Sequence, residues 1–168
     1  HVIYDVGKFG TVARGNLLLS CVSNVYLPGP TTSVSEVIHV GLDAKTPGEH
    51  PLVFLRDNQA PGSIDGAADN WVMVKNLTDL ETIELHCTKE PAGAVVGTMP
   101  ASDVLDALLA DVGATRPSRD AVDARIVTQV KERSGRVIDS QEEVGGWPQY
   151  PPGTPPVDSD GDGMPDAW

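Results

Sequence analysis

The stretches HVIYD (residues 1–5) and SNVYL (residues 23–27) resemble each other, and this resemblance suggests how the first half of the chain folds. Their tyrosines, Tyr4 and Tyr26, lie 22 residues apart. A repeat of this length is typical of one coil of a parallel β-helix, in which each coil buries its inner face against the next coil. Short strands separated by turns also build antiparallel β-sandwiches, so the repeat leaves that fold open as the alternative.

Short apolar runs rich in Val, Ile, Leu and Tyr continue this pattern through residues 1–90. Turns rich in Gly, Pro, Asn and Asp separate the runs, as is typical of strands. None of the runs has the length and period of a helix. The runs expected to form strands are HVIYDVG, NLLLSCVSNVYLPGP, SEVIHVGLDA, PLVFLRDNQAPG, NWVMVKN and ETIELHC. We therefore expect a mainly β part over residues 1–90.

A helical extension is expected over residues 91–139, and its first helix lies in SDVLDALLADVG (102–113). Ser102 is the expected N-cap and Gly113 the expected stop. Five apolar residues recur at helical spacing and predict one buried stripe. They are Val104, Leu105, Leu108, Leu109 and Val112.

The second helix is expected in PSRDAVDARIVTQVKERSG (117–135), after a break at Pro117. It should begin at Ser118 and end at Gly135, with basic residues in its last turn. Val122, Ile126 and Val130 lie four residues apart and predict its apolar face. Both helices need a partner, and the simplest one is an open end or a flank of the β-structure.

Residues 140–168 are dense in Pro and Gly and predict an extended linker that ends in an acidic loop. Trp147 and Tyr150 fall within the linker. Packing of these two rings against the body is the favoured interpretation, and a sugar-stacking patch is the alternative.

The acidic loop, DSDGDGMPDAW (158–168), has the spacing of a calcium-binding loop. Carboxylates crowded into one turn repel one another unless a cation holds them, and glycine at position six permits the sharp turn. The twelfth position, where a bidentate Glu belongs, falls just beyond Trp168, so we expect an incomplete site in a chain cut within the loop. The expected calcium ligands are the side chains of Asp158, Asp160, Asp162 and Asp166, with the carbonyl group of Met164 between them.

Composition narrows the classes of partner. Lys and Arg number 12 and Asp and Glu number 24, which gives a formal net charge of -12. This charge argues against nucleic acid and anionic membranes as partners and suits a secreted protein that handles cations. No apolar run is long enough to cross a bilayer.

Few residues of the sequence are candidates for a disulfide, a metal site or a catalytic role. Cys21 and Cys87 could form a disulfide in an oxidising compartment, but two buried free thiols are the favoured interpretation. The four histidines are scattered without metal-ligand spacing. For Arg14 and for the pair Arg56 and Asp57, we expect turn hydrogen bonds or surface ion pairs rather than catalysis.

Three stretches of the sequence resemble the C-terminal portion of bacterial pectate lyases of the first polysaccharide lyase family. HVIYDVG followed by ARGNLLLSCVSNVYLPGPTT is similar to their late coils, and LADVGATRPSRDAVDARIVTQVKERSGRVIDSQEEVGGWP is similar to their C-terminal tail. DSDGDGMPDAW matches the motif that follows this tail, where the next residue is normally Glu. The chain departs from the family at Cys21 and Ser23, where Asn is usual, and this departure puts an internal asparagine ladder in doubt.

The resemblance implies the distal coils of a right-handed parallel β-helix, followed by two short helices and a tail. It also implies a secreted bacterial enzyme that cleaves polygalacturonate by calcium-dependent β-elimination, and we expect the intact parent to be a monomer. In this chemistry a base removes the C5 proton, and calcium on the uronate carboxylate stabilises the developing charge. The matching catalytic residues would lie upstream of His1, so no catalytic residue is assigned here and the chain itself is expected to be inactive.

A non-catalytic protein is the alternative interpretation. A β-helix adhesin or an extracellular carbohydrate-binding protein with a calcium-stiffened linker would also combine short strands with an acidic loop and lack catalytic groups.

Overall fold

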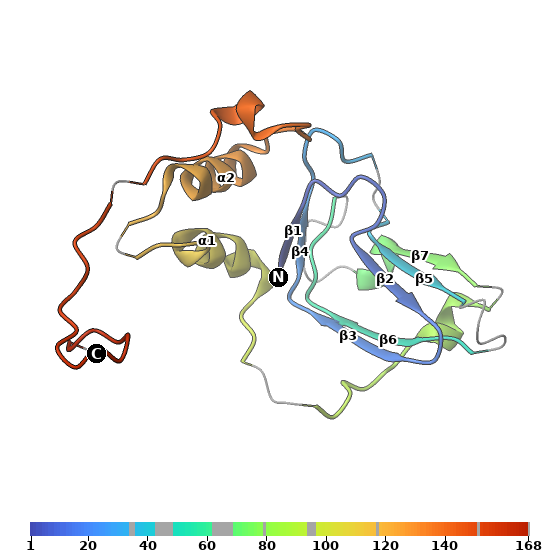
Figure 1. Ribbon diagram of the computed structural model, residues 1–168. Helices are drawn as coiled ribbons and strands as arrows, with labels where there is room; N and C mark the ends of the chain where they lie inside the picture. Colours follow the sequence, from blue (N-terminus) through green and yellow to red (C-terminus); the bar gives the residue numbers. More distant parts are fainter. Residues whose placement is uncertain are drawn as a thin grey trace. The chain divides into compact units, whose positions relative to one another are not determined.

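A computed structural model of the chain describes residues 1–33, 36–42, 49–61, 69–78, 80–93, 97–116, 118–150 and 152–167 (Figure 1). The expected break at Pro117 and the final residue, Trp168, lie outside the described residues. The chain forms two compact units, His1–Val137 and Ile138–Trp168. The first unit is mainly β, as the sequence predicts, and it also carries two α-helices.

The strands of the first unit form three small sheets, and each strand pair among the described residues is parallel. Successive strands of the chain enter different sheets and return to each sheet in turn, which excludes the antiparallel sandwich (Figure 1). Isolated parallel bridges, Val25 with Gln59 and Val53 with His86, extend two of the sheets. The sheets consist of β1 (Val2–Tyr4) with β4 (Val25–Leu27), β2 (Thr11–Arg14) with β5 (Ile38–Gly41) and β7 (Val74–Leu77), and β3 (Leu18–Val22) with β6 (Leu52–Arg56).

The repeat in the sequence is real, but its step is one residue longer than the spacing of the two tyrosines. Ile3 pairs with Tyr26, and Tyr4 pairs with Leu27. A shift of one residue turns a side chain to the other face of a strand. Accordingly, Tyr26 is buried among the sheets and its hydroxyl hydrogen-bonds Thr11 Oγ1 at 2.7 Å, whereas the Tyr4 hydroxyl donates to the carbonyl oxygen of Ser134.

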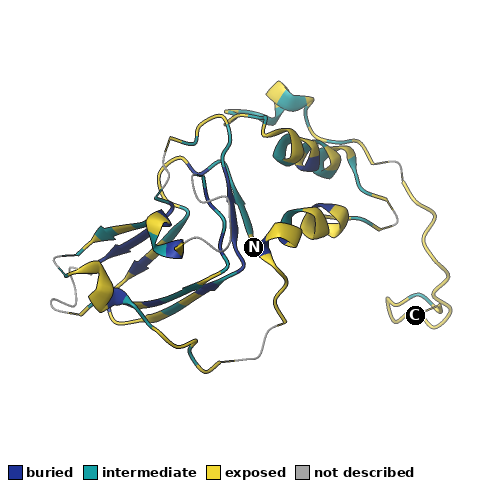
Figure 2. Cartoon of the chain, turned by 180° about the vertical axis from the view of Figure 1, so that it is seen from behind, coloured by how far each residue is buried: buried dark blue, intermediate teal, exposed yellow. Residues whose placement is uncertain are grey.

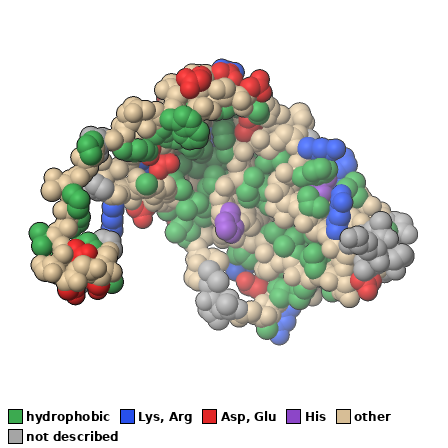
Figure 3. Space-filling view, in the orientation of Figure 1, with side chains coloured by type: hydrophobic (Ala, Val, Ile, Leu, Met, Phe, Trp, Pro, Cys, Tyr) green, Lys and Arg blue, Asp and Glu red, His purple; other side chains and the backbone are tan. Residues whose placement is uncertain are grey.

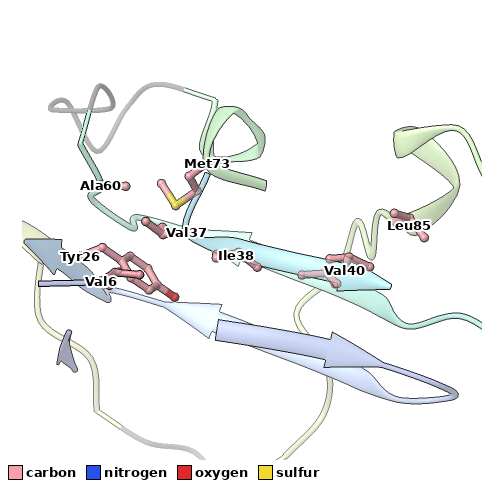
Figure 4. Close-up of a cluster of buried hydrophobic side chains, with 9 residues drawn as sticks. Val6, Tyr26, Val37, Ile38, Val40, Ala60, Met73 and Leu85 are labelled. Atoms are coloured by element: carbon pink, nitrogen blue, oxygen red, sulfur yellow. The ribbon is translucent and has the colours of Figure 1, made fainter. Parts of the chain in front are cut away.

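The main hydrophobic core lies between the three sheets (Figure 4). All four residues of β5 are buried; Ile38 and Val40 are fully buried and belong to the core, whereas His39 and Gly41 lie on the opposite face of the strand. This alternation follows from the period of two in a strand. The buried members of this core are Val6, Tyr26, Val37, Ile38, Val40, Val53, Ala60, Met73 and Leu85.

Helix α1 (Ala101–Asp111) begins earlier than the predicted cap at Ser102 allows. Pro100 occupies the cap position, and the Ser102 hydroxyl hydrogen-bonds Asp103 instead. The Ala101 N–H donates to Asp57 Oδ2 at 2.9 Å, so a distant carboxylate satisfies the group that a local cap would have satisfied. The prediction that Ser102 is the N-cap of this helix is therefore wrong.

Helix α2 (Ala121–Glu132) begins later than the predicted start at Ser118. Asp120 is its N-cap and accepts a hydrogen bond from the Asp123 N–H at 2.8 Å. Lys131 lies in the last turn as predicted, but the helix ends at Glu132, and Arg133, in the left-handed conformation, is its C-cap, before the predicted stop at Gly135.

Both α-helices pack against the sheet of β1 and β4, which confirms a flank of the β-structure as their partner. The predicted apolar face of α2 is partly wrong, because Ile126 is 46% exposed, whereas the neighbouring residue Val127 is buried. Leu108 and Val112 of the first predicted stripe are also exposed. The contact between the helices and this sheet forms a second, smaller hydrophobic core. Its buried members are Val25, Leu27, Ala101 and Val104, and Val2, Tyr4, Leu105 and Val130 pack around them.

Three short 3₁₀ helices complete the regular structure of the described residues. They are η1 (Asn70–Met73), η2 (Thr82–Leu85) and η3 (Gln141–Val144), and η3 belongs to the second unit. None of the described helices is both long and apolar enough to cross a membrane.

The second unit is exposed over most of its length (Figure 2). The Trp147 side chain is 72% exposed and that of Tyr150 is 66% exposed. The favoured interpretation, that both rings pack against the body, concerns a contact between the two units and stays a prediction.

Both cysteines are free, as the favoured interpretation of the sequence expected, but only Cys21 is also buried as expected. Cys21 is buried, and this burial raises the pKa of its thiol to about 11. Cys87 is half-buried, and its sulfur lies 3.0 Å from the carbonyl oxygen of Lys89.

Candidate functional site

The acidic loop brings three of its four predicted carboxylates together. Asp158, Asp160 and Asp162 each place one carboxylate oxygen within 4.8 Å of the others, and all three residues are exposed. Oxygen donors converging in this way suit a hard divalent cation such as Ca²⁺. The structure therefore places these three residues where they could share one ion.

Backbone hydrogen bonds hold the loop in this arrangement. The Asp158 carboxylate accepts from the N–H groups of Gly161 at 2.8 Å and Gly163 at 3.0 Å. The Met164 N–H donates to Asp162 Oδ1 at 2.8 Å. Gly163 has a φ of 89°, a left-handed conformation that a residue with a side chain seldom adopts, which explains glycine at this position.

Asp166, the fourth predicted ligand, has a different set of contacts. Its carboxylate accepts from the Ser159 N–H at 2.8 Å and from the Ser159 hydroxyl at 2.6 Å. These two hydrogen bonds lower the pKa of Asp166 below its usual value. Asp166 therefore stays ionised to lower pH and closes the loop through Ser159.

The candidate residues for chemistry in the first unit have structural contacts. Arg56 forms an exposed ion pair with Glu90 at 3.2 Å, as expected from the sequence. The Asp57 carboxylate accepts from the Ala101 N–H and from the Ser23 hydroxyl, so it links the β3–β4 turn to the start of α1.

Sequence reasoning missed a stack of three buried asparagines, Asn24, Asn58 and Asn70. Asn58 Oδ1 accepts from both the backbone N–H and Nδ2 of Asn24, each at 2.9 Å. Asn70 Oδ1 accepts in turn from the Asn58 N–H at 2.8 Å and from Asn58 Nδ2 at 2.9 Å. The doubt about a ladder, raised by Cys21 and Ser23, was wrong because the ladder begins one residue later, at Asn24.

A signal for this stack exists in the sequence. Each of the three asparagines follows a Ser or an Asp, in SN at 23–24 and DN at 57–58 and 69–70. Ser23 and Asp57 both have a φ of 53°, the left-handed conformation that Asn and Asp tolerate better than most residues. Asp69 has a φ of -54°, so the dipeptide marks this left-handed bend at 23–24 and 57–58 but not at 69–70.

Comparison with known proteins gives one consistent group of relatives. No protein-family model matches the chain, and no solved structure matches it. The chain is 28% identical over 173 aligned positions to proteins named probable pectate lyase C from Aspergillus flavus and from Aspergillus terreus, and 26% identical to the one from Aspergillus fumigatus. Each alignment covers 99% of this chain and 39% of the relative, so the chain spans about two fifths of their length.

These relatives support the coarser part of the resemblance seen in the sequence. They carry the name pectate lyase, in agreement with the expected family likeness. They come from fungi, so the expectation of a specifically bacterial enzyme has no support.

Proposed function

We propose that this chain is part of a secreted pectate lyase, and that the intact protein cleaves polygalacturonate by calcium-dependent β-elimination. The observation that carries the proposal is the similarity to proteins named pectate lyase C along 99% of the chain. The three parallel sheets and the asparagine stack support it, since both suit the coils of a parallel β-helix. We propose that the fold is a right-handed β-helix of this kind.

The proposal divides the chain into three parts. Residues 1–90 would form late coils of the β-helix, residues 91–139 a helical extension that covers one flank, and residues 140–168 a linker with a calcium loop. The contacts of α1 and α2 with β1 and β4 suit the second part. The converging oxygens of Asp158, Asp160 and Asp162 suit the third.

The chemistry would come from groups outside this chain. When bound to a uronate carboxylate, calcium withdraws charge and makes the C5 proton easier to remove. Two of the polar residues beside the strands have structural contacts: Arg56 forms an exposed ion pair with Glu90, and Asp57 accepts from the Ala101 N–H. We therefore propose that the 168-residue chain supports the enzyme without performing the elimination itself.

The test compares this chain with the full-length product of its gene. Each is incubated with polygalacturonate and calcium, and the ultraviolet absorbance of unsaturated uronides is followed. We expect release by the full-length protein, loss of this release with a chelator, and no release by the chain alone. A full-length protein that produces no unsaturated uronide would contradict the lyase assignment, and release by the chain alone would contradict the placement of the chemistry elsewhere.

A non-catalytic extracellular protein that binds carbohydrate is the second candidate. The contacts of Arg56 and Asp57 favour this candidate. Both side chains form structural contacts, and a protein that only binds carbohydrate would need no catalytic group at these positions. It predicts that the full-length protein binds polygalacturonate but leaves its length unchanged, which size-exclusion chromatography of the polymer would detect.

A further inference from the structure

Two exposed aromatic side chains lie close together in the second unit, in the segment between η3 and the acidic loop. Trp147 is 72% exposed and Tyr150 is 66% exposed. Gln149, which lies between them in the chain, is exposed as well. Large aromatic rings are costly to leave in water, so two of them in one short segment suggest a surface that binds a ligand.

The backbone of this segment is extended. Each ring residue directly precedes a proline, Trp147 before Pro148 and Tyr150 before Pro151. A residue before proline is restricted to the β and polyproline II regions, and proline itself has a φ that suits polyproline II. In agreement, residues 148–150 form no helix, strand or turn.

Polyproline II geometry brings the two rings to one face of the segment. This helix has three residues per turn and rises about 3.1 Å per residue, so side chains three residues apart project in the same direction, about 9 Å from each other. Trp147 and Tyr150 have this spacing. The distance is close to the length of a disaccharide in an extended polysaccharide, so both rings can stack on one polymer.

Ordered turns hold both ends of the segment. Before Trp147, at the end of η3, the Gly146 N–H donates to the Gln141 carbonyl oxygen at 2.9 Å. After the segment, the Asp166 N–H donates to the Val157 carbonyl oxygen at 2.8 Å, where the acidic loop closes. A segment held in this way loses less conformational entropy when a ligand binds to its side chains.

The charge of the second unit favours a neutral ligand. Residues 138–168 contain seven Asp and Glu residues and no Lys, Arg or His. Figure 3 shows acidic side chains at the loop and apolar side chains along the segment that leads to it. These carboxylates would repel an acidic polymer but not an uncharged one. The Gln149 amide can both donate to and accept from the hydroxyl groups of a neutral sugar.

We propose that Trp147 and Tyr150 bind a neutral, β-linked polysaccharide, with both rings stacked on the apolar faces of its sugars and Gln149 hydrogen-bonded to its hydroxyl groups. The face of an aromatic ring is electron-rich and attracts the C–H groups that line one face of such a sugar. The inference goes beyond the proposed function, because an uncharged polymer has no uronate group to take part in the elimination. The site holds the polymer and breaks no bond.

The test measures binding of the 168-residue chain to amorphous cellulose in calcium-free buffer, as depletion of the protein from solution. Trp147→Ala and Tyr150→Ala should each lower the affinity about tenfold, because each removes one stacking surface. Phe9→Ala is the matched control, since Phe9 is an aromatic residue of the first unit that is 43% exposed, and it should change the affinity less than about twofold. Equal affinities of all these variants, or no binding by the unmodified chain, would overturn the proposal.

An insertion tests whether the two rings share a face. One glycine inserted after Gln149 keeps both rings and every charge but turns Tyr150 by about a third of a turn relative to Trp147. We expect this insertion to weaken cellulose binding about as much as Tyr150→Ala does, and full binding by the insertion variant would contradict the shared face. Polygalacturonate is measured in parallel, and an equal loss of affinity for both polymers in Trp147→Ala would overturn the preference for a neutral sugar.

The outcomes separate this site from packing of the two rings and from the proposed function. A chain that does not bind cellulose, and that loses free energy of unfolding in Trp147→Ala, would overturn the site in favour of packing against the first unit. Release of unsaturated uronides by the full-length protein, without cellulose binding by the chain, would overturn the site and leave the lyase in place. Cellulose binding through Trp147, in a full-length protein that releases no uronide, would support the site and contradict the lyase.

Discussion

Asn58 Oδ1 accepts two hydrogen bonds from Asn24, one from its backbone N–H and one from its Nδ2, both at 2.9 Å. Both asparagines are buried, and Asn58 is completely so. One carbonyl oxygen thus satisfies two donors that would otherwise be buried without a partner. This contact joins the bend between β3 and β4 to the bend that follows β6.

Removal of the Asn58 side chain should therefore be costly. We expect Asn58→Ala to lower the free energy of unfolding by about 2–4 kcal/mol, because two donors of Asn24 lose their acceptor and the Cys21 carbonyl oxygen loses the Asn58 Nδ2 donor. Urea unfolding followed by circular dichroism measures the change. Asn16→Ala, at an exposed position, is the control and should change the free energy of unfolding by less than about 0.5 kcal/mol. Similar losses for both variants would contradict a role for the stack.

Asp57 should stabilise the start of α1 from a distance. Asp57→Gly keeps the left-handed backbone, with a φ of 53°, and removes the carboxylate that accepts from Ala101. We expect a loss of about 1–2 kcal/mol in the free energy of unfolding and faster amide exchange in the first turn of α1. Asp57→Asn keeps an acceptor oxygen and should lose less. Unchanged exchange in Asp57→Gly would show that the helix start needs no such cap.

The protein should lose stability in alkali through Tyr26. Burial raises the pKa of Tyr26 from 10.0 to about 12, so above pH 10 the unfolded chain releases a proton that the folded chain retains. Stability from this group is complete below pH 10 and is lost as the pH rises towards 12. Urea midpoints measured across this range should fall less in Tyr26→Phe than in the unmodified protein. Tyr150→Phe, at an exposed ring, should follow the unmodified protein, and identical pH profiles for all three would contradict the prediction.

The two free thiols should differ in reactivity. With a pKa of about 11, Cys21 holds only about one thiolate in a thousand molecules at pH 8, and its side chain is buried. We expect iodoacetamide to label Cys87 in the folded protein and to reach Cys21 only after unfolding in urea. Mass spectrometry of the peptides gives both rates, and Cys87→Ser shows the slow site alone. Equal labelling of the two thiols in the folded protein would contradict the burial of Cys21.

Calcium uptake should depend on the three converging carboxylates. For three exposed carboxylates we expect a dissociation constant near ~10⁻³ M, and Asp160→Asn should abolish measurable binding because it removes one of the three charges. Calorimetry or terbium luminescence measures both proteins. Asp106→Asn, on the exposed side of α1, removes the same charge outside the loop and should bind as the unmodified chain does. Loss of binding in this control, or its persistence in Asp160→Asn, would argue for attraction by net charge alone.

Local pattern was sufficient for several features of the chain. Alternating apolar runs predicted a mainly β first part, and the repeat around Tyr4 and Tyr26 pointed to two strands that pair in parallel, β1 and β4. Residues three and four apart predicted both α-helices, although not their first residues. In the loop, spacing alone identified Asp158, Asp160 and Asp162, which the structure brings together. These features depend on residues that lie within one turn or one strand of each other. The residues that form them are therefore close together in the sequence and can be recognised there.

The sequence by itself determined the elements and the acidic loop, because backbone periodicity, glycine conformation and carboxylate spacing act over a few residues. Only the tertiary structure decided the one-residue register that separates Tyr4 from Tyr26, the Asp57 contact at the start of α1, and the asparagine stack. The tertiary structure also decided the strand register that places Val12, His39 and Lys75 side by side on β2, β5 and β7. Each of these joins residues far apart in the chain, and the burial or exposure of a side chain there depends on which distant strand lies beside it.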